Sequence, residues 1–175
     1  MRRQFVRSEQ MAQAQIENVL ASDVNIFACG IGAHRETVAR ARADGKITIA
    51  LLGNSRHVQP ALDSNVDILV AQGHEAGAHT GPIGTFSLVP QIVDLAGDIP
   101  VLAAGGVATG LHIAASFALG AQDVWIGTSW LTTTEQTLHP TLIKILLSAG
   151  SCDTVILRAD SGKTLRQIRT QWSDE

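Results

Sequence analysis

The chemically richest stretch of the chain is Ala71–Gly81, in which two histidines, a carboxylate and an amide alternate with three glycines. It directly follows an apolar run typical of a buried strand, and α/β proteins place ligands at the carboxyl ends of parallel strands. An imidazole titrates near neutral pH, so a histidine here could remove a proton from a bound molecule. Two other interpretations stay open on the residues alone. The histidines could lie in a solvated turn, or His74, Glu75 and His79 could hold a metal, although their spacing is not the helical His-Glu-x-x-His pattern.

Two further strand ends carry small residues that suit a phosphate group. Gly105 and Gly106 follow one apolar run, and Gly127 and Thr128 end the next one along the chain. Glycine lets backbone N–H groups approach a phosphate without obstruction by a Cβ, and the helix after the first pair would add the positive end of its dipole. Each pair alone is a weak signal. Two consecutive loops of this kind, however, are typical of the phosphate site after the last two strands of (β/α) barrels.

The segments that must position these loops alternate between short apolar runs and amphipathic stretches. Helical spacing predicts helices that each end at a glycine, in the regions Arg35–Asp44, Phe86–Ala96 and Gly110–Leu119. The alternation of strands and helices predicts a parallel sheet with right-handed crossovers. Runs rich in branched residues predict five strands buried on both faces, at Val24–Cys29, Ile47–Leu52, Val66–Ala71, Pro100–Ala104 and Val124–Gly127.

The predicted fold class is α/β, and the phosphate-loop positions favour a TIM-type (β/α) barrel. A closed barrel needs eight βα units, whereas about five are recognisable here, so we expect an incomplete barrel that lacks its N-terminal strands. A complete open sheet is the alternative. We expect one domain over residues 1–175, in which 8–20 is a helix with Ser8 as its N-cap and 136–175 is a C-terminal helical extension containing a short β-type run at 154–157.

Composition and charge narrow the class of partner. The 175 residues are 45% hydrophobic and carry a formal net charge of -3, which provides neither a basic surface for nucleic acid nor a patch for an anionic membrane. No stretch approaches the roughly 20 apolar residues that span a bilayer. The two cysteines, Cys29 and Cys152, suit reduced thiols better than a disulfide framework. We therefore expect a cytoplasmic protein with a small-molecule ligand; a homo-oligomer is compatible with these features.

Three segments together resemble the nitronate monooxygenase family, also called nitropropane dioxygenases, which are FMN-containing (β/α)-barrel enzymes. The segments are VAQGHEAGAHTG, LVPQIVDLAGDIPVLAAGGVATG and ALGAQDVWIGTSW, and the resemblance runs collinearly from about Val24 to Thr134. It implies that His79 is the catalytic base that removes the acidic proton of a nitroalkane. The residues that it implies for FMN binding are Gln72 and Gly77 in the histidine loop, and Gly105, Gly106, Gly127 and Thr128 around the phosphate.

The sequence departs from the family pattern at three points. Ala78 stands where the family usually has glycine, which would matter if that position requires a positive φ. Trp125 and Ile126 replace the usual Gln-Met, so we expect only backbone contacts to the cofactor from them. The opening strands of the family barrel have no counterpart in the sequence.

The resemblance implies an FMN-dependent nitronate monooxygenase that oxidises nitronates or nitroalkanes with oxygen and holds no metal. A flavin-dependent enoyl-ACP reductase is the alternative, because that family shares nearly the same loops but uses NAD(P)H and a thioester. An inactive truncated remnant of either family is a third alternative.

Overall fold

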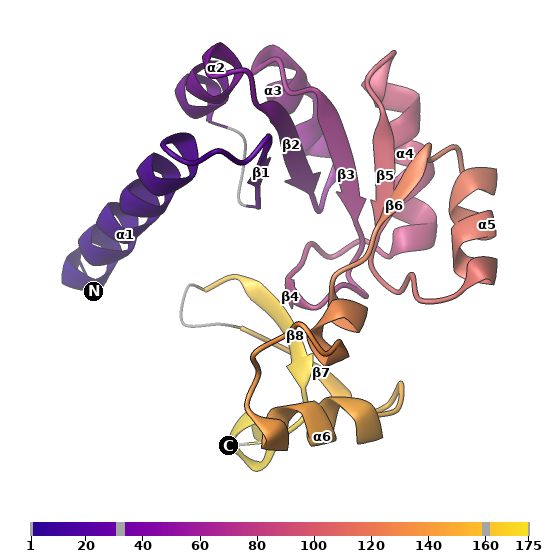
Figure 1. Cartoon of the computed structure of the whole chain (residues 1–175). Coiled ribbons are helices and arrows are strands. Elements are labelled where there is room, and N and C mark those ends of the chain that lie inside the picture. Colours follow the sequence, from indigo (N-terminus) through magenta and orange to yellow (C-terminus); the bar gives the residue numbers. More distant parts are fainter. Residues whose placement is uncertain (1, 31–33, 159–161, 175) are drawn as a thin grey trace.

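The computed structural model describes residues 2–30, 34–158 and 162–174. Five strands form one parallel sheet (Figure 1), and the spatial order β1-β2-β3-β5-β6 follows their order along the chain. The five predicted strands are confirmed, with boundaries that shift by one or two residues. Their bounds are β1 Ile26–Cys29, β2 Ile47–Leu52, β3 Ile68–Gln72, β5 Val101–Ala104 and β6 Asp123–Trp125.

Helices connect successive strands, as the sequence pattern predicts. The glycines after three of them, Gly45, Gly97 and Gly120, all have positive φ, the conformation in which glycine ends a helix without a steric penalty. The third helix tolerates Pro60 because that residue lies in its first turn, where a missing N–H breaks no helical hydrogen bond. The bounds are α2 Arg35–Ala43, α3 Val58–Asp63 (after a short 3-10 turn, η1 Ser55–His57), α4 Thr85–Ala96 and α5 Gly110–Ala118.

The two faces of the sheet are both apolar but are packed differently. One face joins the helices in the main core, where Leu69, Leu88 and Ile92 are completely buried. The other face has its own cluster of Ile49, Val70 and Ala104, with Leu51, Ile68, Leu102 and Trp125 beside it. Ile47 lies two residues before Ile49 and therefore on this same face, and it is 46% exposed. The second face is thus buried near β3 and open toward β1.

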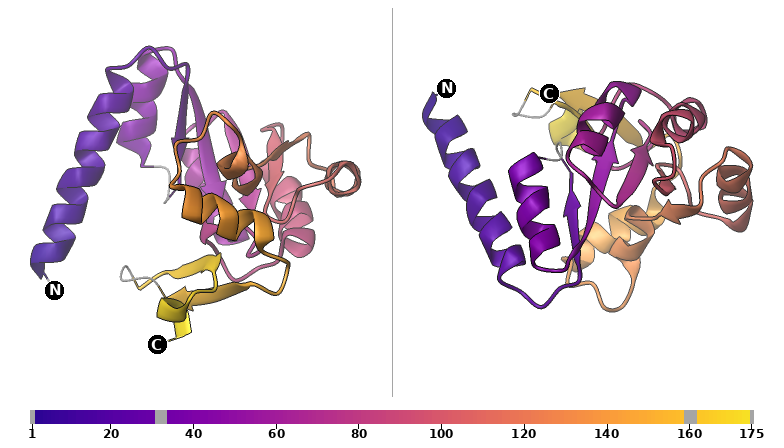
Figure 2. Two further views of the ribbon diagram at one scale, coloured as in Figure 1. Left: turned by 60° about the horizontal axis from the view of Figure 1, so that its bottom comes forward. Right: turned by 90° about the horizontal axis from the view of Figure 1, so that it is seen from above.

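The N-terminal helix is longer than the sequence indicates. The helix α1 spans Arg2–Leu20 and lies beside α2 (Figure 2), to which Glu17 is tied by an ion pair with Arg40 at 2.6 Å. Ser8 therefore lies inside the helix, and the prediction that it is the N-cap is wrong. The helix-forming arginines and the glutamine before Ser8 continue the same helix. No helix in the described part of the chain is long and apolar enough to cross a membrane.

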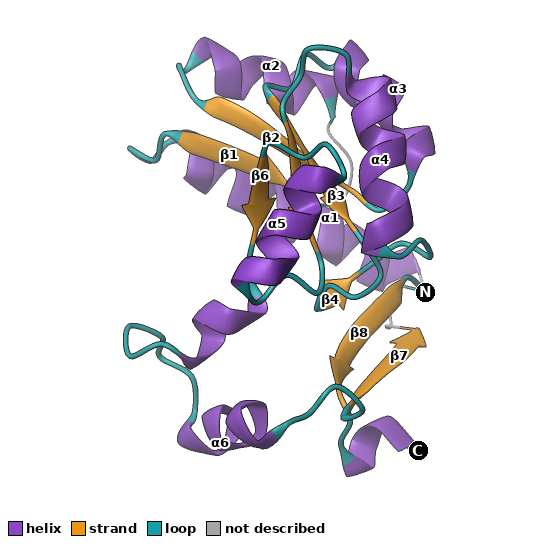
Figure 3. Cartoon of the chain, turned by 90° about the vertical axis from the view of Figure 1, so that its right-hand side faces the viewer, coloured by secondary structure: helices purple, strands orange, loops and turns teal. Residues whose placement is uncertain are grey.

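The C-terminal region is a mixture of helix and strands, so the prediction of a helical extension is wrong for its second half. One helix is present, α6 at Pro140–Ser148, with proline at its first position and His139 as its cap. It is followed by an antiparallel hairpin of β7 (Thr154–Arg158) and β8 (Thr164–Ile168). Strand β8 also pairs with the two-residue strand β4 (Ala78–His79), which places the hairpin beside the histidine loop (Figure 3). In β7 the half-buried Val155 and Leu157 lie on either side of the exposed Ile156, as the two-residue period of a strand requires.

Candidate functional site

The carboxyl ends of β3, β5 and β6 meet at one cavity of about 580 Å³, a size within the roughly 300–1,000 Å³ typical of small-molecule sites. Strands that run parallel in one sheet end at the same edge, which explains why loops far apart in sequence come together there. Apolar side chains from the C-terminal region, including Leu146 and Ile168, complete its wall. All eight residues predicted to contact a cofactor line this cavity: Gln72, Gly77, Gly105, Gly106, Trp125, Ile126, Gly127 and Thr128.

Two glycines of this cavity, Gly105 and Gly106, have a backbone conformation that larger residues rarely adopt. Gly105 and Gly106 have φ of +99° and +72°, in the region that strongly favours glycine. A Cβ on Gly105 would lie 3.0 Å from both the Ala76 nitrogen and the Gly73 oxygen, and one on Gly77 would lie 3.2 Å from the Thr128 hydroxyl. The loops after β3, β5 and β6 are thus in close contact, and at their meeting point the cavity is bordered by glycine backbone and by the Thr128 hydroxyl. Such a donor set fits a phosphate group.

The sequence suggests that the helix after the double glycine, α5, directs the positive end of its dipole at the phosphate site, but its N-terminus does not line the cavity. The wall of the cavity includes Val107 but none of residues 108–111. Three amides at this end of α5 already have partners in the same turn, because the Thr109 hydroxyl accepts from the His112 N–H and His112 Nδ1 accepts from the Ala108 and Thr109 N–H groups. This capping box occupies donors that a phosphate at the end of α5 could otherwise use. The expected contribution of the α5 dipole is therefore not supported.

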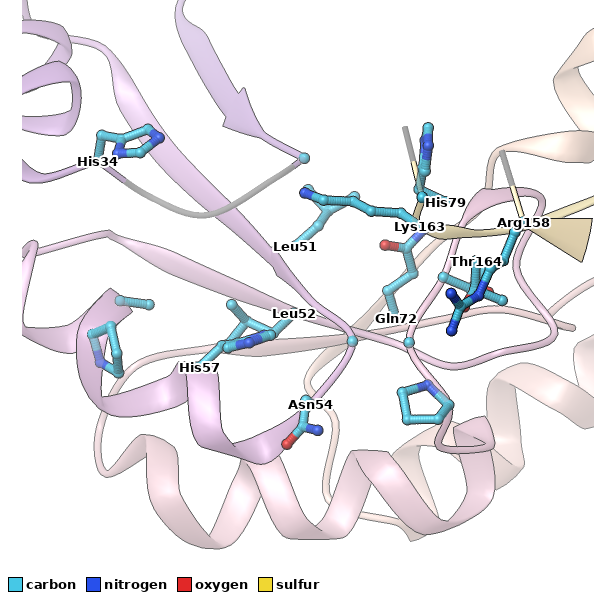
Figure 4. Close-up of a pocket in the computed structure, with 18 residues that line it drawn as sticks. His34, Leu51, Leu52, Asn54, His57, Gln72, His79, Arg158, Lys163 and Thr164 are labelled. Carbon is cyan, nitrogen blue, oxygen red and sulfur yellow. The ribbon is translucent and has the colours of Figure 1, made fainter. Parts of the chain in front are cut away.

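The structure places His79 on β4, where it is half-buried and faces Leu165 of β8 across the small antiparallel sheet. Its side chain lines a second cavity of about 610 Å³ rather than the cavity of the glycines. Gln72 lines both cavities, so the two adjoin at the end of β3. Figure 4 shows this second cavity, in which the Gln72 amide lies between β3 and the hairpin that carries Lys163. His79 and the glycines thus belong to adjoining compartments.

Glu75, which the sequence suggested only as a possible metal ligand, holds the histidine loop in place. The Glu75 carboxylate accepts hydrogen bonds from the N–H and the hydroxyl of Thr85, both at 2.8 Å, at the start of α4. The same hydroxyl lies 2.8 Å from the Gly105 carbonyl oxygen. Burial disfavours the charged carboxylate, but the hydrogen bonds from Thr85 outweigh this effect, so the pKa of Glu75 lies below its usual value. Glu75 therefore joins the loops after β3 and β5 to α4.

The nearby His74 gives no support to a metal site. Its Nδ1 atom lies 3.7 Å from a Glu75 carboxylate oxygen. Across the described residues, no three His, Cys, Asp or Glu side chains are grouped so that they could hold a metal ion.

Glu75→Gln is expected to lower the free energy of unfolding by roughly 1 kcal/mol at neutral pH, after allowance for its partial exposure. A carboxyl whose folded pKa is depressed contributes stability above its unfolded pKa and loses it as the pH falls through the folded value. The difference between the two proteins should therefore be constant above about pH 5, shrink below the usual Glu pKa of 4.5, and vanish under more acidic conditions. Urea unfolding of both proteins across this range measures it. A difference that does not change with pH would contradict the role of the charged form.

The family to which the chain belongs is decided by its match to a family model. The model described as Nitronate monooxygenase matches residues 3–175, which is nearly the whole chain. The chain belongs to the nitronate monooxygenase family. A protein of Mycobacterium tuberculosis named as a monooxygenase is 43% identical over 93% of this chain, and the match covers 44% of that protein.

Solved structures confirm the barrel architecture of this family member. FabK from Thermotoga maritima superposes with a TM-score of 0.84 at 30% identity, over 91% of this chain and 51% of FabK. A nitroalkane oxidase from Streptomyces ansochromogenes gives 0.82 at 30% identity, over 93% of this chain and 50% of the oxidase. The five parallel strands are thus part of a (β/α) barrel, and the prediction of a partial TIM-type barrel is confirmed. The chain spans about half the length of the relatives that it matches.

Ala78, one of the departures from the family pattern, has a φ of +67°. This conformation costs a residue with a Cβ about 1–2 kcal/mol. The preceding Gly77 does not have a positive φ. Within the histidine loop of this nitronate monooxygenase family member, position 78 is therefore the strained one, and it lies immediately before His79.

Ala78→Gly is expected to raise the free energy of unfolding by about 0.5–1 kcal/mol, because relief of the strained φ exceeds the added entropy of glycine in the unfolded chain. Ala76→Gly in the same loop is the matched control. Ala76 does not have a positive φ, so its replacement should lower the stability by a similar amount. Chemical denaturation of the three proteins measures both effects. Equal losses in the two variants would show that position 78 is not strained.

Proposed function

We propose that this chain provides the FMN- and substrate-binding loops of a nitronate monooxygenase, which oxidises nitronates or nitroalkanes with oxygen. The observation that carries the proposal is the convergence of three strand ends on one glycine-bordered cavity, with Gln72 shared between this cavity and the one that His79 lines. One compartment then suits the phosphate end of a flavin, and the adjoining one suits the substrate. The family membership supports the same division of roles.

Each residue has a distinct part in this proposal. The backbone of Gly105, Gly106 and Gly127 and the Thr128 hydroxyl hold the phosphate, since these groups lie together where the loops after β5 and β6 line the cavity. Gln72 and Gly77 would contact the cofactor from the histidine loop, and Trp125 and Ile126 would contact it through their backbone. When bound, FMN supplies the chemistry that carries electrons from substrate to oxygen.

His79 handles the proton in this proposal. A neutral nitroalkane must lose a proton from the carbon next to the nitro group before it can be oxidised, and an imidazole nitrogen of His79 accepts it. The strand pairing of His79 with Leu165, together with the hydrogen bond from the Thr80 N–H to the Thr164 oxygen at 3.1 Å, fixes the backbone on both sides of the ring. A fixed base is efficient because less entropy is lost when substrate and base meet.

The proposal is tested by titrating the purified chain with FMN and then supplying substrate. Quenching of flavin fluorescence should show binding of FMN, and the loaded protein should consume oxygen with ethylnitronate and with nitroethane in the absence of NADH. Oxidation of NADH that depends on an enoyl thioester, without activity on either nitro compound, would favour the enoyl reductase alternative. A well-folded chain that binds no flavin would overturn the proposal.

A further inference from the structure

The C-terminal hairpin brings one cation to the cavity of the glycines. Arg166 lies in the middle of β8, directly opposite Ala78 of the histidine loop. Two residues that line the cavity lie beside it on the same strand, Gln167 and Ile168. The hairpin therefore forms part of the cavity wall, even though it is remote in sequence from the strand ends.

Two hydrogen bonds hold the Arg166 guanidinium in place. Its Nε donates to the His74 carbonyl oxygen at 2.9 Å, and one terminal nitrogen donates to the Thr154 hydroxyl at 2.7 Å. These bonds connect the start of the histidine loop to β7. A guanidinium has five N–H donors in a rigid planar fork, so three donors remain after both bonds are made. The side chain is half-buried, which strengthens its electrostatic interactions relative to those of an exposed cation.

The two charged side chains that line the cavity differ in how much hydrogen-bonding capacity remains for a ligand. Among the described residues that line it, Glu75 and Arg166 are the charged ones. The Glu75 carboxylate is engaged by Thr85, as described above. Arg166 is consequently the single cation on this wall of the described structure. The glycine loops add N–H groups but no net charge, and the α5 terminus is capped by its own side chains.

We propose that Arg166 is a binding residue for the phosphate of the cofactor, and that the same guanidinium links that phosphate to the loop carrying His79. The proposal rests on the proposed function, because it assumes that a flavin phosphate enters this cavity. A phosphate that neutralises Arg166 would be held by charge-assisted hydrogen bonds, which are roughly twice as strong as neutral ones. It would also fix the His74 carbonyl, and so the start of the loop, in its bound position.

The test compares the affinities of FMN and riboflavin, which differ only in the phosphate. Arg166→Met should weaken FMN binding by about 10- to 100-fold, as expected for loss of a charge-assisted contact. Its riboflavin affinity should stay within about twofold of that of the unmodified protein, since riboflavin offers no phosphate. Fluorescence quenching measures both constants. Arg169→Met is the matched control, because Arg169 directly follows β8 of the same hairpin and lines neither cavity, and it should leave FMN binding unchanged.

Two further measurements keep the outcome decisive if Arg166→Met folds poorly. Arg166→Lys keeps the charge and should lose less FMN affinity than the Met variant would. In the unmodified protein, inorganic phosphate should compete with FMN but not with riboflavin. Equal weakening of both flavins, or no competition by phosphate, would overturn the role of Arg166 and leave the proposed function standing. An unmodified protein that binds neither flavin would overturn both.

Discussion

His79→Asn is expected to slow the oxidation of a neutral nitroalkane by about 100- to 10,000-fold, which is the usual contribution of a positioned general base. Oxidation of the preformed nitronate should change by only a few-fold, because that substrate has already lost its proton. Asparagine has a similar size and can hydrogen-bond, but it cannot accept a proton at neutral pH. The pairing of β4 with β8 involves backbone atoms, so it should survive the substitution. Oxygen consumption with nitroethane and with ethylnitronate measures the two rates.

The control for this prediction is a second histidine of the same cavity. His57 comes from η1 and lines the cavity that His79 lines (Figure 4). His57→Asn should cause a far smaller loss with nitroethane if proton removal is specific to His79. Equal losses with nitroethane and ethylnitronate in His79→Asn would remove the assignment of the base and would indicate a role in binding instead.

The parallel sheet could be predicted from sequence because its signals are local. Apolar runs such as Ile47–Leu52 are long enough and rich enough in branched residues to identify buried strands. Gly45, Gly97 and Gly120 could be identified as helix ends because few other residues accept their positive φ. Once the strands and their direction are known, the rule that parallel strands end at one edge brings Gln72, Gly105 and Gly127 together.

The features that could not be predicted depend on contacts between residues that are distant in sequence, and such contacts leave little signal in the local sequence. Nothing in the composition of residues 164–168 shows that they pair with Ala78 and His79, because the partner strand β4 has only two residues. Glu75 looks like a solvated loop carboxylate until the Thr85 N–H is placed beside it. The position of His79 in the adjoining cavity follows from that same pairing with β8. The family resemblance indicates candidate residues but not the cavity that each one lines.

The contact between the histidine loop and α4 also makes Gly73 highly sensitive to substitution. Gly73→Ala is expected to lower the free energy of unfolding by at least about 3 kcal/mol, at the upper end for overpacking. The added Cβ would lie 2.5 Å from the Thr85 Cα and would also overlap the Thr85 backbone nitrogen and hydroxyl. Thr85 has little freedom to move aside, since Glu75 and the Gly105 carbonyl hold it.

Gly110→Ala is the matched control for this substitution. A Cβ at Gly110 meets nothing within 4 Å, and the residue begins helix α5, so alanine should be neutral or stabilising there by up to about 1 kcal/mol. Urea unfolding of the two variants, followed by titration with FMN, separates loss of fold from loss of the cavity. If Gly73→Ala unfolds at the same urea concentration as the unmodified protein, the loop and α4 cannot be in the contact that brings Glu75, Thr85 and Gly105 together. The packing of the histidine loop against α4, on which the shape of both cavities depends, would then be wrong.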